Sequence, residues 1–211
     1  YLKIQIIIFG FIISGRLSIN NKMKTISVND KNSVNAAVNV ILDGGIIVYP
    51  TDTLYGFGVD ARNKSAIKKL NNIKRRKTPM SVITWSVNAM FSWSNIDDTD
   101  FKKVENVLRE SNTIIIPVKN NIAHKDILAD DGSLGIRMPH HTYPISLCKA
   151  LNFPITTTSV NKAGEDPLND PELIRNEFHD EIDLIIDAGR LPSSEGSSIF
   201  KLVNSKLKLI R

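Results

Sequence analysis

Cysteine is almost absent from this sequence: Cys148 is the only one in 211 residues. An intramolecular disulfide is therefore excluded, and a reducing, cytoplasmic setting is expected. Cys148 lies in an apolar run, where a lone cysteine is typical of a small core residue and not of a nucleophile. The apolar run at residues 4–13 is short for a bilayer span and no clear cleavage pattern follows it, so no membrane association is expected, with an anchor or targeting segment as the alternative.

Several common ligand-binding motifs are also missing. The sequence has no GK[ST] loop, no GxGxxG motif and no CxxC pair, which excludes the usual signatures of nucleotide and zinc sites. Two adjacent histidines, His140 and His141, do not make a metal site by themselves, so no protein-bound metal is expected. Aromatic residues are 7% of the chain, which is few for a protein that stacks single-stranded RNA bases.

The composition that remains is that of a basic globular protein. Hydrophobic residues are 42% and charged residues 23%, which suits a single domain with a substantial core. The formal charge of +5 favours nucleotides, nucleic acids or other anions without choosing among them. Residues 1–22 are predicted to be an extension outside the domain, which is expected to occupy residues 23–211.

Apolar periodicity predicts that helices and strands alternate along the chain. Helices are expected at residues 33–42, 65–73, 101–109, 145–151 and 171–178, and strands at 46–49, 80–84, 113–118, 134–138, 155–158 and 184–187. Residues 198–203 and 207–210 are predicted to close the sheet as a hairpin across Asn204-Ser205. This order predicts an α/β fold with a mixed sheet covered by helices.

Polar clusters follow or border the predicted strands, which is where ligands bind in α/β proteins. The clusters are residues 50–58, 74–79, 132–141 and 156–164, with more hydroxyls at 193–198. The first cluster places hydroxyls and a carboxylate directly after a buried strand, and Gly56 and Gly58 allow a ligand to approach the backbone. A tight turn capped by threonine and aspartate explains the same cluster equally well.

Three of these clusters leave two interpretations open each. The cations from Lys74 to Lys77 either clamp phosphates or stand solvated at a helix C-terminus, where the dipole favours them. A buried Arg137 needs an anionic partner, which is either a substrate carboxylate or an internal acid. Ser159 and Asn161 point to one side of an extended segment, where they contact a ligand or form a turn.

Taken in order, the clusters resemble the motifs of the YrdC-like family. That family shows PT[DE]TxYGLG after a strand, K-x-R at a helix end, TxxVRxP, SxN after a strand, and a late STI strand start that ends near an arginine. These motifs stand here at residues 50–58, 74–76, 133–139, 159–161, 197–199 and 211. The resemblance covers the chain from about residue 44 to its last residue.

The resemblance implies a twisted mixed parallel and antiparallel sheet flanked by helices, with a basic concave site. It implies synthesis of L-threonylcarbamoyl-AMP from ATP, L-threonine and bicarbonate, with release of pyrophosphate and with Mg²⁺ accompanying ATP. Catalysis is expected to rest on positioning and charge stabilisation. The product would pass to a separate threonylcarbamoyl transferase for tRNA modification, and tRNA or double-stranded RNA is a candidate partner.

The resemblance also assigns roles residue by residue. Arg137 would pair with the threonine carboxylate, within a threonine site formed by Thr53, Arg137, Ser159 and Ser197. The catalytic residues facing the phosphates would be Lys74 and Arg76. The contacts to ATP would come from Arg76, Thr78, Ser133, Asn161 and Arg211.

The sequence departs from the family pattern, and two other functions stay open. Where the family usually has PGPxT, this chain has residues 109–113, RESNT; the loop after K-x-R is shorter, and Ser198 replaces a threonine. One alternative is a non-catalytic RNA-binding or ribosome-maturation protein that uses the same basic concave surface. The other is carbamoyl-adenylate chemistry, as in hydrogenase maturation. Threonine-dependent turnover separates the enzymatic readings.

Overall fold

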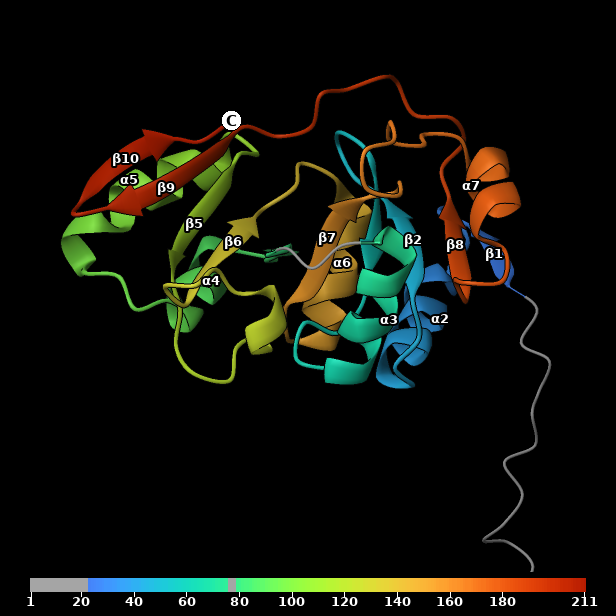
Figure 1. Cartoon of the computed structure of the whole chain (residues 1–211), viewed down its shortest axis with the longest axis horizontal. Helices are drawn as coiled ribbons and strands as arrows, with labels where there is room; N and C mark the ends of the chain where they lie inside the picture. Colours follow the sequence, from blue (N-terminus) through green and yellow to red (C-terminus); the bar gives the residue numbers. More distant parts are fainter. Residues whose placement is uncertain (1–22, 76–78) are drawn as a thin grey trace, which may run out of the picture.

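Ten strands of the described chain form one sheet that runs across the molecule (Figure 1). The computed structural model describes residues 23–75 and 79–211, so the predicted extension at 1–22 lies outside the described residues. The strand order is β1-β8-β2-β3-β7-β4-β6-β5-β9-β10. The bounds are β1 Lys24–Ser27, β2 Ile47–Pro50, β3 Tyr55–Gly58, β4 Ser81–Ile83, β5 Thr113–Pro117, β6 Ser133–Arg137, β7 Ile155–Ser159, β8 Leu184–Asp187, β9 Ile199–Val203 and β10 Lys206–Leu209.

The sheet mixes parallel and antiparallel pairs, as the sequence predicts. The pairs β1–β8, β8–β2, β4–β6 and β5–β9 are parallel. The pairs β2–β3, β3–β7, β7–β4, β6–β5 and β9–β10 are antiparallel. The expected terminal hairpin forms across Asn204 and Ser205, both of which have positive φ. It extends the sheet at one edge.

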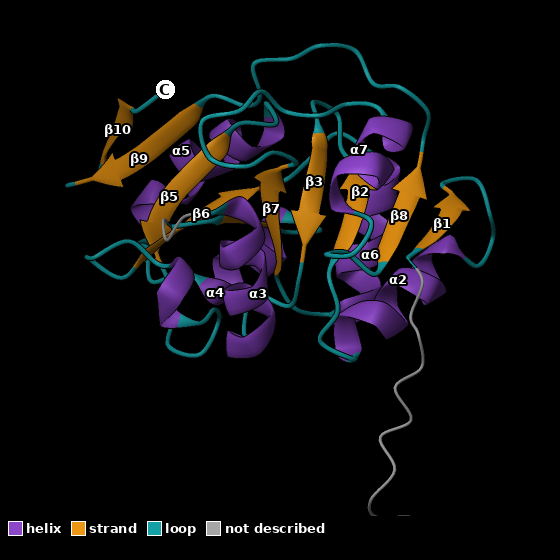
Figure 2. Ribbon diagram, turned by 45° about the vertical axis from the view of Figure 1, so that its right-hand side comes forward, coloured by secondary structure: helices purple, strands orange, loops and turns teal. Residues whose placement is uncertain are grey.

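Helices cover both faces of the sheet (Figures 1 and 2). Their bounds are α2 Ser33–Leu42, α3 Lys64–Lys74, α4 Val87–Trp93, α5 Asp98–Arg109, α6 Thr142–Leu151 and α7 Pro171–Phe178, with a 3₁₀ turn at Lys125–Ile127. The α6 hydroxyl of Tyr143 donates to the α2 carbonyl of Ser33 at 3.1 Å, which joins those two helices. The ring of Phe57 in β3 meets the ring of Phe178 in α7 edge to face, with 5.3 Å between their centres. The ammonium of Lys74 in α3 lies 5.6 Å from the centre of the Phe57 ring.

Helix α3 shows how local sequence sets these elements. Asn63 caps its start, because the Asn63 side chain accepts from the backbone N–H groups of Ser65 and Ala66. Its apolar stripe, which includes Ile67 and Leu70, is fully buried. The helix ends where Arg75 adopts a left-handed conformation with φ of 53°. Lys74, the last helical residue, is thereby placed against the sheet.

Two strands and one α-helix lie outside the sequence expectations. Residues 55–58 form the buried strand β3 and not only a polar loop, and Gly58 fits there because a Cβ would lie 2.7 Å from the Tyr49 ring. Strand β1 is a mostly exposed edge strand without an apolar run. Helix α4 is short and begins where the Ser86 hydroxyl accepts from the Ala89 N–H at 3.1 Å. None of the described helices has the length and apolar character needed to span a membrane.

Candidate functional site

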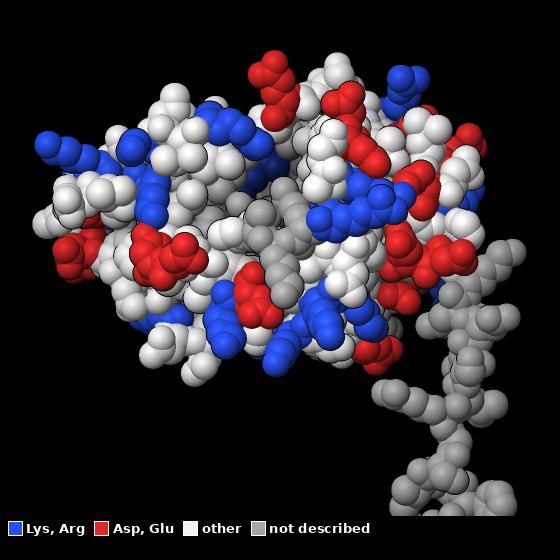
Figure 3. Space-filling view, in the orientation of Figure 1, with Lys and Arg blue, Asp and Glu red and all other residues white. Residues whose placement is uncertain are grey.

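A cleft of about 350 Å³ lies over the central strands, where β3, β7, β4, β6 and β5 meet the segment leading into β9. Hydroxyl side chains and two arginines dominate its lining: Thr51, Thr53, Tyr55, Ser81, Thr113, Thr157, Thr158, Ser159, Ser197, Arg137 and Arg211. Figure 3 shows a hollow on one face of the molecule, with both basic and acidic side chains near its rim. A larger groove of about 1080 Å³ lies beside β1, but no predicted site residue that the structure describes lines it.

The four residues predicted to hold threonine all line this cleft. Thr53 lies in the turn between β2 and β3, and Arg137 is the last residue of β6. Ser159 ends β7, and Ser197 lies just before β9. The fold therefore brings together side chains that are up to 144 positions apart in the sequence, from Thr53 to Ser197 (197 minus 53). Their contact with threonine stays a prediction.

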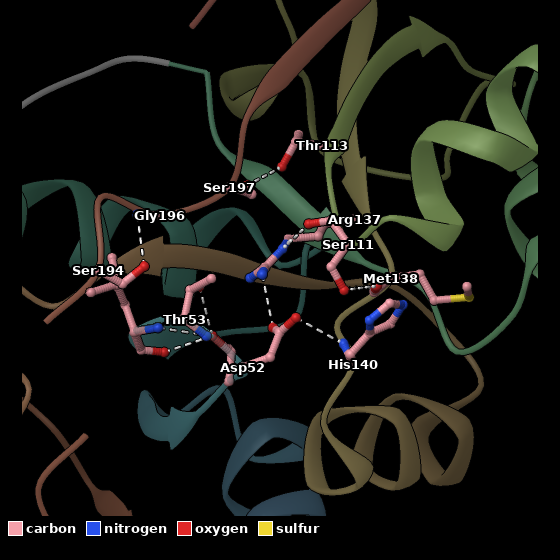
Figure 4. Close-up of polar contacts among 12 residues, drawn as sticks. Asp52, Thr53, Ser111, Thr113, Arg137, Met138, His140, Ser194, Gly196 and Ser197 are labelled. Atoms are coloured by element: carbon pink, nitrogen blue, oxygen red, sulfur yellow. Dashed lines mark hydrogen bonds and ion pairs between the residues drawn. The ribbon is translucent and has the colours of Figure 1, made fainter. Parts of the chain in front are cut away.

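Arg137 is 5% exposed and its guanidinium is held from two sides (Figure 4). Its Nη2 donates to Asp52 Oδ1 at 2.8 Å, and its Nε donates to the Ser111 carbonyl at 3.0 Å. The other oxygen of Asp52 accepts from the His140 N–H at 3.0 Å. Burial lowers the pKa of Arg137, and the charge of Asp52 opposes that shift. An internal carboxylate is thus present, and Arg137 still lines the cleft.

The departure from the family's PGPxT segment falls directly behind this arginine. Ser111 adopts a left-handed conformation with φ of 55° just after helix α5. Its carbonyl accepts from Arg137, and its hydroxyl donates to the Met138 carbonyl at 3.3 Å. Although this segment contains no proline or glycine, Ser111 still turns the chain here, and its carbonyl supports Arg137.

Lys74 is 1% exposed and fastens the turn that carries the SxN motif. Its Nζ donates to the Ser159 carbonyl at 2.5 Å, to the Asn161 carbonyl at 2.9 Å and to Asn161 Oδ1 at 3.1 Å. The Ser159 hydroxyl donates to the same Asn161 Oδ1 at 2.6 Å. These contacts give Lys74 a positioning role for Ser159. Its contact with phosphate stays a prediction, and Lys74 does not line the cleft.

The cleft is bounded on the β9 side by contacts of Ser197. Its hydroxyl shares a hydrogen bond of 2.8 Å with the hydroxyl of Thr113, and its carbonyl accepts from Arg211 Nη2 at 3.1 Å. The Arg211 carbonyl in turn accepts from the Ile199 N–H at 2.9 Å. The last residue of the chain is therefore held next to Ser197, and both line the cleft.

Two predicted nucleotide contacts lie outside the lining of this cleft. Ser133 is at the opposite end of β6 from Arg137, and its hydroxyl donates to Asp131 Oδ1 at 2.5 Å. Lys201 donates to the other oxygen of Asp131 at 2.6 Å. Asn161 is engaged by Lys74 and by its own loop carbonyls. Arg76 and Thr78 fall outside the described residues.

Sequence reasoning assigned no role to Asp52, which holds the cleft residue Arg137, or to the cleft residues Thr113 and Ser81. Asp52, the partner of Arg137, stands in the first motif but carries no assignment there. Thr113 and Ser81 read as ordinary strand residues, although both line the cleft. Only the pairing of distant strands reveals them. Within residues 23–75 and 79–211, no cluster of three His, Cys, Asp or Glu side chains could hold a metal ion.

Comparison with known proteins places this geometry in a family. The family model Sua5_yciO_yrdC, described as telomere recombination, matches residues 39–211. The chain belongs to the Sua5/YciO/YrdC family. This confirms the predicted resemblance, and the mixed sheet with flanking helices confirms the predicted fold class.

Curated relatives of this Sua5/YciO/YrdC chain are named as threonylcarbamoyl-AMP synthases. A protein assigned to that activity in Methanocaldococcus jannaschii is 34% identical over 174 residues, covering 81% of each chain. A Hydrogenovibrio crunogenus protein of the same name is 29% identical over 158 residues, covering 66% of this chain and 78% of its own.

Solved structures share the fold. A P. abyssi Sua5 variant has a TM-score of 0.79 at 21% identity, covering 90% of this chain, while this chain spans 60% of that protein. P. abyssi Sua5 in complex with L-threonine has a TM-score of 0.76 at 22% identity, covering 84% of this chain and 53% of that one. E. coli YciO has a TM-score of 0.76 at 25% identity, covering 84% of this chain and 87% of its own.

Proposed function

We propose that this chain makes L-threonylcarbamoyl-AMP from ATP, L-threonine and bicarbonate and releases pyrophosphate. One observation carries the proposal: Arg137 and the hydroxyls of Thr53, Ser159 and Ser197 line a single cleft in a member of a family with relatives named for this synthesis. The P. abyssi Sua5 structure of the same fold, which is a complex with L-threonine, gives further support.

The reaction needs two bond-forming steps. The α-amine of threonine attacks the carbon of bicarbonate, and water leaves, so that a carbamate forms. A carbamate oxygen then attacks the α-phosphorus of ATP, the bond from that phosphorus to the bridging oxygen breaks, and pyrophosphate leaves. Neither step requires a covalent enzyme intermediate, so the protein acts by holding the reactants together and by matching their charges.

The cleft residues have chemically suitable roles in this scheme. The Arg137 guanidinium pairs with the threonine carboxylate, and the hydroxyls of Thr53, Ser159 and Ser197 hydrogen-bond its polar groups. Arg211 stands at the same cleft, where a cation meets the phosphates of the second substrate. Mg²⁺ enters as part of MgATP, because this ion is usually bound through the phosphates of the substrate and not by a site made only of protein ligands.

The wider setting follows from the product. A mixed anhydride of this kind is consumed by a separate threonylcarbamoyl transferase acting on tRNA, in the cytoplasm. A purely RNA-binding role is disfavoured because the curated relatives are named as synthases. Full-length HypF in its phosphate- and nucleotide-bound form shares the fold, but this chain covers 28% of it at 21% identity, so that likeness concerns the fold alone.

Pyrophosphate release by the full chain tests the proposal. Release from ATP is expected to require both L-threonine and bicarbonate, and to be lost in Arg137→Ala and in Arg76→Ala. Arg175→Ala is the matched control, because Arg175 lines the groove beside β1, and it is expected to keep full activity. A folded wild-type chain whose pyrophosphate release is indifferent to threonine would overturn the proposal.

A further inference from the structure

Asp52 joins three parts of the candidate threonine site (Figure 4). It lies in the turn that carries Thr53, and its side chain is 16% exposed. One oxygen accepts from Arg137 Nη2 at 2.8 Å, and the other accepts from the His140 N–H at 3.0 Å. Each carboxylate oxygen therefore has a donor, and the β2–β3 turn is tied to the end of β6 and to the segment after it.

The contacts of Arg137 leave a defined set of donors for a ligand. An arginine carries five N–H donors in one plane. The Ser111 carbonyl occupies Nε and Asp52 occupies one N–H of Nη2. Among the described residues, Nη1 has no hydrogen-bond partner, and Arg137 lines the cleft. Nη1 and the second N–H of Nη2 are thus the donors left over for a carboxylate in the cleft.

We propose that Asp52 is a positioning residue that fixes the plane of Arg137, so that these remaining donors face the carboxylate of L-threonine. The inference rests on the proposed function and deepens it. Asp52 does not touch the substrate in this scheme; it acts through Arg137. Asp52 accepts from Nη2 of Arg137, and the Ser111 carbonyl accepts from Nε. Loss of the Asp52 carboxylate therefore frees the Nη2 edge of the guanidinium, while Ser111 still holds the Nε edge.

Charge and orientation predict opposite effects, and this makes the inference testable. Asp52→Asn removes a negative charge next to Arg137, so on charge alone an anionic carboxylate should bind more tightly. If Asp52 were a plug that competes with the substrate, binding should also tighten. If Asp52 positions Arg137, binding should weaken, because an asparagine oxygen is a weaker and neutral acceptor.

Steady-state pyrophosphate release by the full chain gives the decisive readout. For Asp52→Asn, the KM for L-threonine is expected to rise by about tenfold to a hundredfold, because a binding group displaced by about 1 Å typically costs a factor of that size. The KM for ATP is expected to stay within about twofold of wild type. Asp52→Glu is expected to recover most of the loss, since it restores the charged acceptor. Asp60→Asn is the matched control: Asp60 pairs with Arg62 at 2.9 Å, its side chain is 14% exposed, and it lies outside the cleft.

The outcomes separate the inference from the function on which it rests. An unchanged or lowered threonine KM in Asp52→Asn, with an active wild-type chain, overturns the positioning role. A wild-type chain without threonine-dependent release overturns the proposed function. In that case calorimetric titration of L-threonine into wild type, Asp52→Asn and Asp52→Glu decides on Asp52 from affinity alone. If Asp52→Asn does not fold, Asp52→Glu decides: a loss of fold in both makes Asp52 structural and overturns the inference.

Discussion

Replacing Lys74 by methionine removes a buried ammonium while it keeps an unbranched chain of similar length. The ammonium holds the Ser159 and Asn161 carbonyls at 2.5 and 2.9 Å and Asn161 Oδ1 at 3.1 Å. Methionine leaves both carbonyls without this donor, at about 1–3 kcal/mol for each buried acceptor. Removing a buried charge returns part of that cost, because the ammonium no longer needs to be desolvated. We expect a net loss of about 2–4 kcal/mol in the free energy of unfolding.

Chemical denaturation of the full chain measures this loss directly. Lys68→Met is the matched control, because Lys68 is an exposed residue of the same helix, and we expect a change within about 0.5 kcal/mol. A lysine that acted only on phosphate would lose activity in Lys74→Met and keep its stability. The reasoning is refuted if Lys74→Met is no less stable than Lys68→Met.

Three further predictions concern burial, pH and packing. Burial raises the pKa of the Cys148 thiol to about 12, so native protein at about pH 8 should react with a thiol reagent only as fast as it unfolds; prompt reaction in native buffer would contradict this burial. Hydrogen bonds from Lys201 and then Ser133 lower the pKa of Asp131 to about 2, so its contribution is full above its ordinary pKa and is lost as pH falls toward 2. Because the side chain is 54% exposed, Asp131→Asn should cost under about 1 kcal/mol at neutral pH and only a small part of that near pH 2. Equal losses of stability in denaturation at both pH values would refute this pH dependence. Gly58→Ala should destabilise by about 1–3 kcal/mol, because its Cβ would lie 2.7 Å from the Tyr49 ring; an unchanged melting temperature would contradict that packing.

The sequence predicts most of the core sheet because its buried strands are short apolar runs. Residues 184–187 and 113–117 show this, since both runs are rich in isoleucine and each is preceded by a polar residue. Periodicity cannot find β3, because glycine occupies two of its four positions and the packing of Tyr49 fills the space. It also cannot find β1, whose pairing with β8 depends on residues 184–187 folding back beside the first strand.

The candidate site shows the same limit. The motif order brings out Thr53, Arg137, Ser159 and Ser197, and the fold gathers them in one cleft. The residues that hold them, such as Asp52 for Arg137 and Lys74 for Ser159, are brought close only by the tertiary fold and cannot be predicted from the motifs. The inward direction of Lys74 cannot be read from a run of cations at a helix end, which looks solvated.

The most direct test of the proposed function identifies the product. The 211-residue chain is incubated with ATP, L-threonine and carbon-13 bicarbonate, and the mixture is analysed by mass spectrometry. We expect threonylcarbamoyl-AMP carrying one labelled carbon from the wild-type chain, and none from Arg137→Ala. Pyrophosphate release without a labelled threonine adduct, or an equal yield from Arg137→Ala, would contradict the assignment of this cleft as the site of synthesis.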